Sequence, residues 1–106
     1  MVAIKVLTAR KFKQGTVQEA HQLLRELRAV GTLRQGFVSG QTLISVEDPH
    51  RLLVVSTWTD IKGWEAWRAS ERRSEISKKI AELLEAPEHV EVYYAGRKES
   101  EGADMA

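Results

Sequence analysis

The sequence predicts an α+β domain in which four antiparallel strands form one sheet and the helices lie on one of its faces. Three observations predict this fold. Four segments carry strand-like apolar patterns, two segments repeat apolar residues at helical spacing, and their order is β, α, β, β, α, β. That order is the split pattern of ferredoxin-like folds. At 106 residues, 42% of them apolar, the chain suffices for one packed domain, assigned to residues 1–96.

The first strand and the first helix open the chain. Residues 2–13 are rich in apolar and β-branched side chains, which is typical of a strand. Thr16 then stands three residues before Glu19, the spacing of a capping box at a helix start. Over residues 16–30 apolar side chains recur at steps of three and four, which predicts a helix with one buried face. Arg28 is expected to point away from that face.

A hairpin follows the helix. The segment "FVSGQTLISVED", residues 37–48, is the second predicted strand, and Gly40 inside it predicts a bulge or a bend. A turn at Pro49 leads into the third strand, residues 51–59.

The second helical region covers residues 61–84, capped by Thr59 or Asp60, and its "ASER" stretch predicts a bend that divides it into two helices. A proline then blocks continuation, and "HVEVYYAG", residues 89–96, is the fourth strand. Residues 97–106 are polar without apolar periodicity, which predicts a flexible C-terminal tail.

Both faces of the predicted sheet are apolar. The first strand has Leu7 and Ala9 on one side and Ile4 and Val6 on the other, and the third strand is apolar on both sides too. Helices on one face leave the other uncovered. A second copy of the chain is therefore expected to pack on it, giving a sheet-to-sheet homodimer.

The composition disfavours several classes of partner. Sixteen basic and fifteen acidic residues are interleaved along the chain, which does not indicate nucleic-acid binding. The basic segment "RASERRSEISKK" alternates its charges, which favours a solvated helix face over a phosphate site. The lack of cysteine excludes disulfides and thiolate chemistry. No signal peptide or membrane-length apolar run is evident, so no membrane association and a cytoplasmic location are expected.

Six segments together carry a resemblance to a known family: "IKVLTARKF", "EAHQLLRELRAV", "QGFVSGQTL", "EDP", "VVSTW" and "WEAWRASERRSEI". Over residues 2–95 the chain resembles the antibiotic biosynthesis monooxygenase domains of the dimeric α+β barrel group. The resemblance implies a homodimer whose two sheets form a barrel. It also implies a pocket in each subunit between the sheet and that subunit's own helices.

Some members of that family oxidise aromatic polyketides or quinols with molecular oxygen and use neither metal nor flavin. The resemblance therefore implies a monooxygenase without a cofactor that acts on a small hydrophobic, aromatic or quinol molecule. The alternative is a non-enzymatic dimeric module that binds or senses a hydrophobic metabolite in the same pocket.

A second branch of the family binds and degrades haem. In that branch a histidine ligates the iron ten positions after a tryptophan that corresponds to Trp67, and an asparagine of the first strand points at the haem. Here those positions hold Ser77 and Thr8. A serine hydroxyl is a poor neutral ligand for iron, so haem degradation is the less favoured reading.

The candidate substrate-binding residues are Trp67, Thr8, Trp58, His21 and Ser77. The resemblance places pocket residues at Trp67, whose indole offers a flat apolar face and one N–H donor, so pocket lining and plain core packing both stay open. A core role suffices for Trp58. Thr8 is either pocket lining or a strand former, and His21 faces either the pocket or solvent. No catalytic residue is assigned.

Arg10 and the histidines offer two further possibilities. Arg10 would neutralise an anionic substrate oxygen, although an exposed arginine at a strand end is the favoured reading. His21, His50 and His89 are widely separated and lack a metal-ligand spacing, so no metal site is expected.

Overall fold

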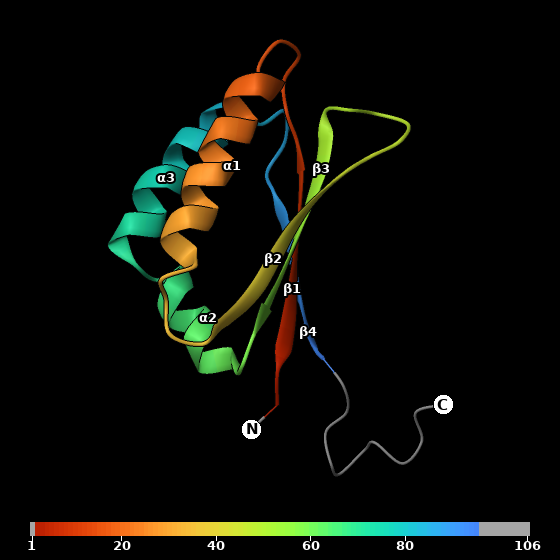
Figure 1. The fold of residues 1–106 in the computed structure, drawn as a ribbon. Coiled ribbons are helices and arrows are strands. Elements are labelled where there is room, and N and C mark those ends of the chain that lie inside the picture. The colour runs from red at the N-terminus through yellow and green to blue at the C-terminus, as the bar shows by residue number, and fades with distance from the viewer. Residues whose placement is uncertain (1, 96–106) are drawn as a thin grey trace.

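The computed structural model describes residues 2–95. Its elements are β1 (Ile4–Lys11), α1 (Val17–Gly31), β2 (Phe37–Ile44), β3 (Arg51–Trp58), α2 (Ile61–Arg68), α3 (Glu71–Glu82) and β4 (His89–Tyr94). The strands form one antiparallel sheet in the order β2-β3-β1-β4. All helices lie on one face of this sheet and the other face is bare (Figure 1). The predicted ferredoxin-like fold is confirmed. The predicted tail, residues 97–106, lies outside the described residues.

The helix starts agree only in part with the sequence patterns. The predicted capping box of α1 is wrong, because the Thr16 hydroxyl donates to a carbonyl of the preceding turn at 2.7 Å and caps no N–H group. Asp60 caps α2 as expected and accepts from the Gly63 N–H at 3.0 Å. Ser70 accepts from the Arg73 N–H at 3.2 Å and starts α3. This second cap divides the helical region at the predicted place.

The second strand is shorter than predicted and its irregularity lies elsewhere. It ends at Ile44, and the register shifts between Phe37 and Ser39. Of the bulge or bend predicted at Gly40, the bulge is wrong, because Gly40 pairs regularly with Ser56. The reason for a glycine here is a contact on the helix side of the sheet, described below.

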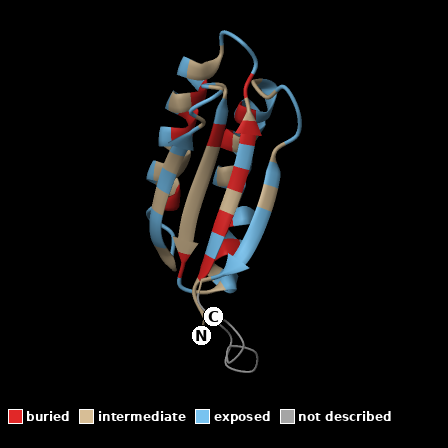
Figure 2. Ribbon diagram, turned by 90° about the vertical axis from the view of Figure 1, so that its right-hand side faces the viewer, coloured by how far each residue is buried: buried red, intermediate tan, exposed pale blue. Residues whose placement is uncertain are grey.

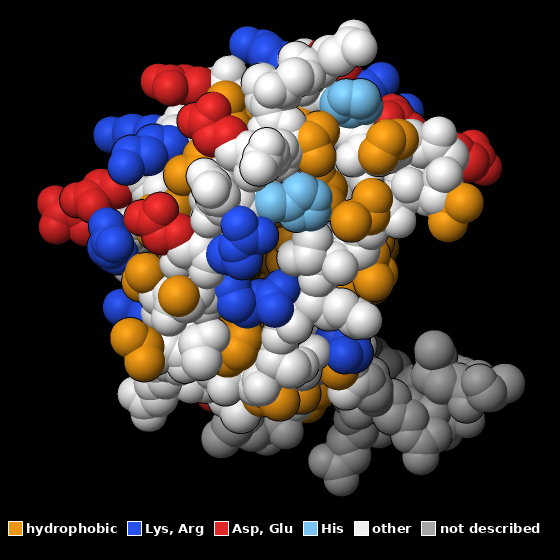
Figure 3. Space-filling view, turned by 45° about the horizontal axis from the view of Figure 1, so that its top comes forward, with side chains coloured by type: hydrophobic (Ala, Val, Ile, Leu, Met, Phe, Trp, Pro, Cys, Tyr) orange, Lys and Arg blue, Asp and Glu red, His pale blue; other side chains and the backbone are white. Residues whose placement is uncertain are grey.

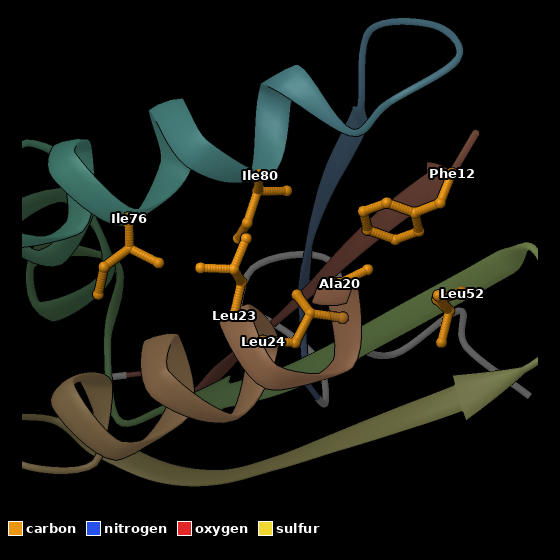
Figure 4. Packing of buried hydrophobic residues seen from close by; sticks show 7 residues of the cluster. All are labelled: Phe12, Ala20, Leu23, Leu24, Leu52, Ile76 and Ile80. Carbon is orange, nitrogen blue, oxygen red and sulfur yellow. The ribbon is translucent and has the colours of Figure 1, made fainter. Parts of the chain in front are cut away.

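Two buried clusters fill the space between the helices and the sheet. In the first, side chains of α1 and α3 meet over the ends of β1 and β3 (Figure 4). Its buried members are Phe12, Ala20, Leu23, Leu24, Leu52, Ile76 and Ile80. The second lies at the other end of the sheet, under α2. It consists of Ile4, Val6, Trp58, Trp64 and Trp67.

The bare face of the sheet carries apolar side chains, as predicted. The register places Leu7 beside Val55 and Ala9 beside Leu53 on this face. Figure 2 looks onto it and shows β3 half-buried and β4 exposed. Hydrophobic side chains also gather where the β2–β3 hairpin projects, whereas acidic and basic ones are interspersed over the helices (Figure 3). A monomer thus leaves an apolar surface in water.

Candidate functional site

A pocket lies between the helices and the covered face of the sheet. Its polar walls are Thr8, Arg10, Arg28, Thr42, Ser56 and Arg73. Its apolar walls are Leu24, Leu27, Gly31, Phe37, Val54, Trp58, Trp64 and Trp67. Along β1 and β3, every second residue therefore faces the pocket, and the residues between them lie on the bare face of the sheet.

The pocket exists because small side chains cross the middle of the sheet. The register aligns Thr42 with Val54, Val54 with Thr8, and Thr8 with Val90. On either side of this Thr-Val-Thr-Val row the two core clusters fill the layer with leucine, isoleucine and tryptophan. Three short side chains of this row, Thr42, Val54 and Thr8, line the hollow that remains between the clusters.

The hollow is small in this conformation. Its volume is about 60 Å³. An engineered cavity that binds benzene measures about 150 Å³. The pocket as it stands therefore accepts small polar groups, and an aromatic ring needs a side chain to move aside.

The three tryptophans are both core and pocket wall. Trp58 is 1% exposed, and its Nε1 donates to Ser56 Oγ at 3.1 Å. Its ring packs edge-on against Phe37 at 5.4 Å and lies 6.0 Å from the ring of Trp64. This matches the core role expected for Trp58, although the residue also lines the pocket.

Trp67 lies flat against the end of α1. A Cβ atom at Gly31 would stand 3.3 Å from its ring, so this glycine gives the indole its place. Among residues 2–95 no hydrogen-bond partner contacts the Trp67 N–H group, in contrast to that of Trp58. The side chain combines a buried apolar face with an unused donor beside the pocket.

Arg28 enters the pocket over Gly40, contrary to the sequence expectation that it points away. Its Nη2 donates to Thr42 Oγ1 at 3.1 Å. A Cβ atom at Gly40 would lie 2.7 Å from Arg28 Nε, closer than packing allows. The glycine is therefore explained by the close approach of this guanidinium group.

Gly40→Ala is expected to behave differently with and without Arg28. Alanine suits a strand interior better than glycine by about 0.5–1 kcal/mol. In the native chain its methyl group displaces Arg28 and disturbs the bond to Thr42, whereas an Arg28→Ala background removes the three atoms nearest to that methyl group. A double-mutant cycle on urea unfolding is expected to give a coupling free energy of about 1 kcal/mol. Additive effects would contradict the contact.

Arg10 is a buried residue, not the exposed strand-end arginine that the sequence favoured. It is 5% exposed, and its Nε donates to Glu88 Oε1 at 2.9 Å. Glu88 lies just before β4 and remains partly exposed. The pair places one guanidinium group and its neutralising carboxylate at the β4 side of the pocket.

Arg73 stands near this pair without a carboxylate of its own. Its guanidinium lies 5.4 Å above the Trp64 ring, and its Nε atom is buried without a hydrogen-bond partner among residues 2–95. Burial lowers the pKa of Arg73, which the Glu88 carboxylate counteracts and the Arg10 cation reinforces. A guanidinium group still remains protonated in proteins.

The other two candidates from the sequence do not line this pocket. His21 lies in a groove between α1 and β2, together with Arg25, Ala29 and Ile44. Ser77 lies one helical turn after Arg73 on α3, in a neighbouring groove. The structure thus brings Trp67, Trp58 and Thr8 together and leaves His21 and Ser77 outside.

Sequence reasoning missed Arg28 and Arg73. For Arg28 the available signal was Gly40, because a glycine inside a strand often marks the close approach of another group. For Arg73 the signal was its spacing from Ile76 and Ile80, which continues the buried stripe of α3. The prediction of a solvated face for the whole segment "RASERRSEISKK" overlooked the buried position of Arg73 within it.

Comparison with known proteins assigns the chain to a family. The sequence model described as "Antibiotic biosynthesis monooxygenase" matches residues 3–79. The chain belongs to the antibiotic biosynthesis monooxygenase family. No curated protein matches it.

Solved structures agree with this family on the fold. A conserved protein from Methanosarcina mazei Go1 superposes with a TM-score of 0.83 at 24% identity, covering 88% of this chain and 92% of that one. A protein from Shewanella oneidensis gives 0.80 at 21% identity, covering 88% and 90%. SnoaB, a cofactor-independent oxygenase from Streptomyces nogalater, gives 0.83 at 14% identity, covering 95% and 100%.

Residues 2–95 offer neither a cluster of metal ligands nor a membrane-spanning helix. Within residues 2–95 no three His, Cys, Asp or Glu side chains gather closely enough to hold a metal ion. None of the helices in the same range is long and apolar enough to cross a membrane.

Proposed function

We propose that this member of the antibiotic biosynthesis monooxygenase family is a cofactor-independent oxygenase, acting with O2 on a small aromatic or quinol substrate in the pocket. One observation carries the proposal. The walls combine indole surfaces with three guanidinium groups, and the one carboxylate paired with them, that of Glu88, lies outside the lining. Such a site suits a planar molecule that reacts as an anion.

The chemistry needs an ionised substrate more than it needs acid or base residues. Neighbouring cations lower the pKa of a bound hydroxyl and favour its deprotonation. The carbanion or phenolate then gives an electron to O2, the two radicals combine in a new C–O bond, and the resulting peroxide loses water. For an anthrone methylene the balance is CH2 + O2 → C=O + H2O, with no external reductant. The pocket supplies binding, orientation and exclusion of bulk water.

Substrate entry is assigned to Arg28. A cavity of about 60 Å³ has no room for a ring while this side chain lies over Gly40. Arg28 is half-buried and is held by a hydrogen bond to the neutral Thr42 hydroxyl. A hydrogen bond to a charged group contributes about 1.5–3 kcal/mol, and binding of the ring would have to offset this loss when the side chain swings outward.

The proposal includes a homodimer with a cytoplasmic location. The apolar residues of the bare face support the dimer, because Leu7, Leu53 and Val55 would otherwise stay in contact with water. The two sheets would pack face to face, each pocket remaining within its own subunit.

Oxygen uptake by the purified protein tests the activity. With an anthrone or a dihydroxynaphthalene as substrate, O2 consumption above the uncatalysed rate is expected. Trp67→Ala is expected to lower kcat/KM by about a hundredfold, because it removes the stacking surface and the free N–H group. Trp67→Phe keeps the stacking surface and is expected to retain most of the activity, and Leu33→Ala on the surface serves as the control.

The outcome also decides between the enzyme and the binding module. The module would bind the same compounds in the same pocket without any reaction with O2. Quenching of tryptophan fluorescence by these compounds without any O2 uptake would support the module and refute the oxygenase.

A further inference from the structure

We infer that Arg73 and Arg10 form a carboxylate-binding subsite at the β4 side of the pocket, so that the ligand is a small aromatic acid. This rests on the proposed function for the aromatic part of the ligand and adds the class of its substituent. The carboxylate would lie beside Arg73. The ring would extend across the same pocket toward Arg28, which lies over β2.

The charge balance of this corner supports an anion. Arg10 and Arg73 bring two positive charges, and Glu88 brings one negative charge through its 2.9 Å contact with Arg10. Among residues 2–95 no carboxylate lies within ion-pairing distance of Arg73, whose close contact is the face of Trp64. The Glu88 carboxylate that acts on Arg73 is already paired with Arg10, so a bound carboxylate would supply the second negative charge that the two guanidinium groups lack.

An unused hydrogen-bond donor lies at the same corner. The described residues contain two buried side-chain polar atoms without a partner, Arg73 Nε and Ser77 Oγ. Arg73 lines the pocket, whereas Ser77 lies in the neighbouring groove with Glu85 and Glu88, so only the Arg73 donor bears on the subsite. A buried donor without a hydrogen bond is unfavourable, and a ligand oxygen would satisfy it.

The size of the pocket fits a carboxylate better than a ring. At about 60 Å³ the hollow is well below the about 150 Å³ of a cavity that binds benzene, so it suits a small polar group better than a ring. The acid group can therefore occupy the existing hollow, and only the ring requires Arg28 to move. The position of Arg28 over β2 places the movable wall away from the proposed subsite.

Binding of a matched pair of probes tests the subsite. The probes are 1-hydroxy-2-naphthoate and its carboxamide, which have nearly the same shape but differ in charge. Titrations followed by tryptophan fluorescence and by calorimetry are expected to show the carboxylate binding at least about tenfold more tightly. Arg73→Gln is expected to abolish this preference. Arg72→Gln is the matched control, because the neighbouring arginine is 54% exposed and pairs with Glu75 and Glu26 on the surface.

A third variant separates the subsite from a merely structural role of Arg73. Glu88→Gln keeps an oxygen acceptor for Arg10 and removes the competing negative charge. It is therefore expected to tighten binding of the carboxylate about threefold or more, which damage to the fold would not do.

Several results would overturn the inference. They are equal affinity for the two probes, no measurable binding of either, an equal loss in Arg72→Gln and Arg73→Gln, or weaker binding in Glu88→Gln. Failure of the proposed function has a different signature. In that case the carboxylate preference depends on Arg73 although no compound, acidic or neutral, causes O2 uptake.

Discussion

Trp58→Ala is expected to lower the free energy of unfolding by about 3–5 kcal/mol, the usual cost of truncating a large buried aromatic side chain. Trp58 is 1% exposed and packs against Phe37 and Trp64 at the centre of the second core cluster. Its loss also leaves the Ser56 hydroxyl without the indole donor. Since single domains are stable by about 5–15 kcal/mol, the variant retains little margin.

Urea unfolding followed by circular dichroism measures this effect. Leu33→Ala is the control, because Leu33 is 85% exposed in the loop after α1 and its truncation should change stability by less than about 0.5 kcal/mol. A loss below about 1 kcal/mol in Trp58→Ala would show that the site collapses around the missing ring, and that the cluster is more plastic than its packing indicates.

Val55→Asp is expected to convert the proposed dimer into a folded monomer. Val55 lies in the middle of the bare face, between Leu7 on β1 and Gln41 on β2. In a dimer the carboxylate of the introduced aspartate would be buried against the second sheet without a partner, which costs several kcal/mol. In a monomer the same carboxylate stays in water and leaves the core intact.

Light scattering coupled to gel filtration gives the molecular mass of each variant, and circular dichroism verifies folding. Leu33→Asp introduces the same charge in an exposed loop away from the bare face and is expected to remain dimeric. A native chain that is already monomeric in dilute solution, or a Val55→Asp variant that stays dimeric, would refute the proposed sheet-to-sheet interface.

The fold could be predicted because its signals are local and repeated. Apolar residues alternate along the strands and recur at helical spacing in α1 and α3. The break between α2 and α3 is marked by Ser70, a residue type that often caps helices. Single-residue signals were less dependable. Thr16 has the spacing of a cap, yet its hydroxyl finds a nearer carbonyl, a choice that depends on the geometry of the preceding turn.

The pocket was predictable in position but not in charge. Thr8 and Trp67 could be placed there from the family resemblance, and both line it. The orientation of a long arginine depends on which neighbour leaves room for it, and that neighbour is distant in sequence: Gly40 for Arg28, and Trp64 for Arg73. The spacing of apolar residues along a helix predicts which way the Cα of an arginine faces, but it does not predict which neighbours the guanidinium group contacts.

The alternation of β1 and β3 has a consequence for how this protein can diverge. Even-numbered positions of both strands face the pocket, and odd-numbered positions face the second subunit of the proposed dimer. Ligand binding and dimer formation therefore depend on different residues. Point substitutions can retune one property while sparing the other. An inserted or deleted residue within either strand would turn the residues that follow it to the opposite face of the sheet. Polar side chains would then face the partner subunit, and apolar side chains would fill the pocket.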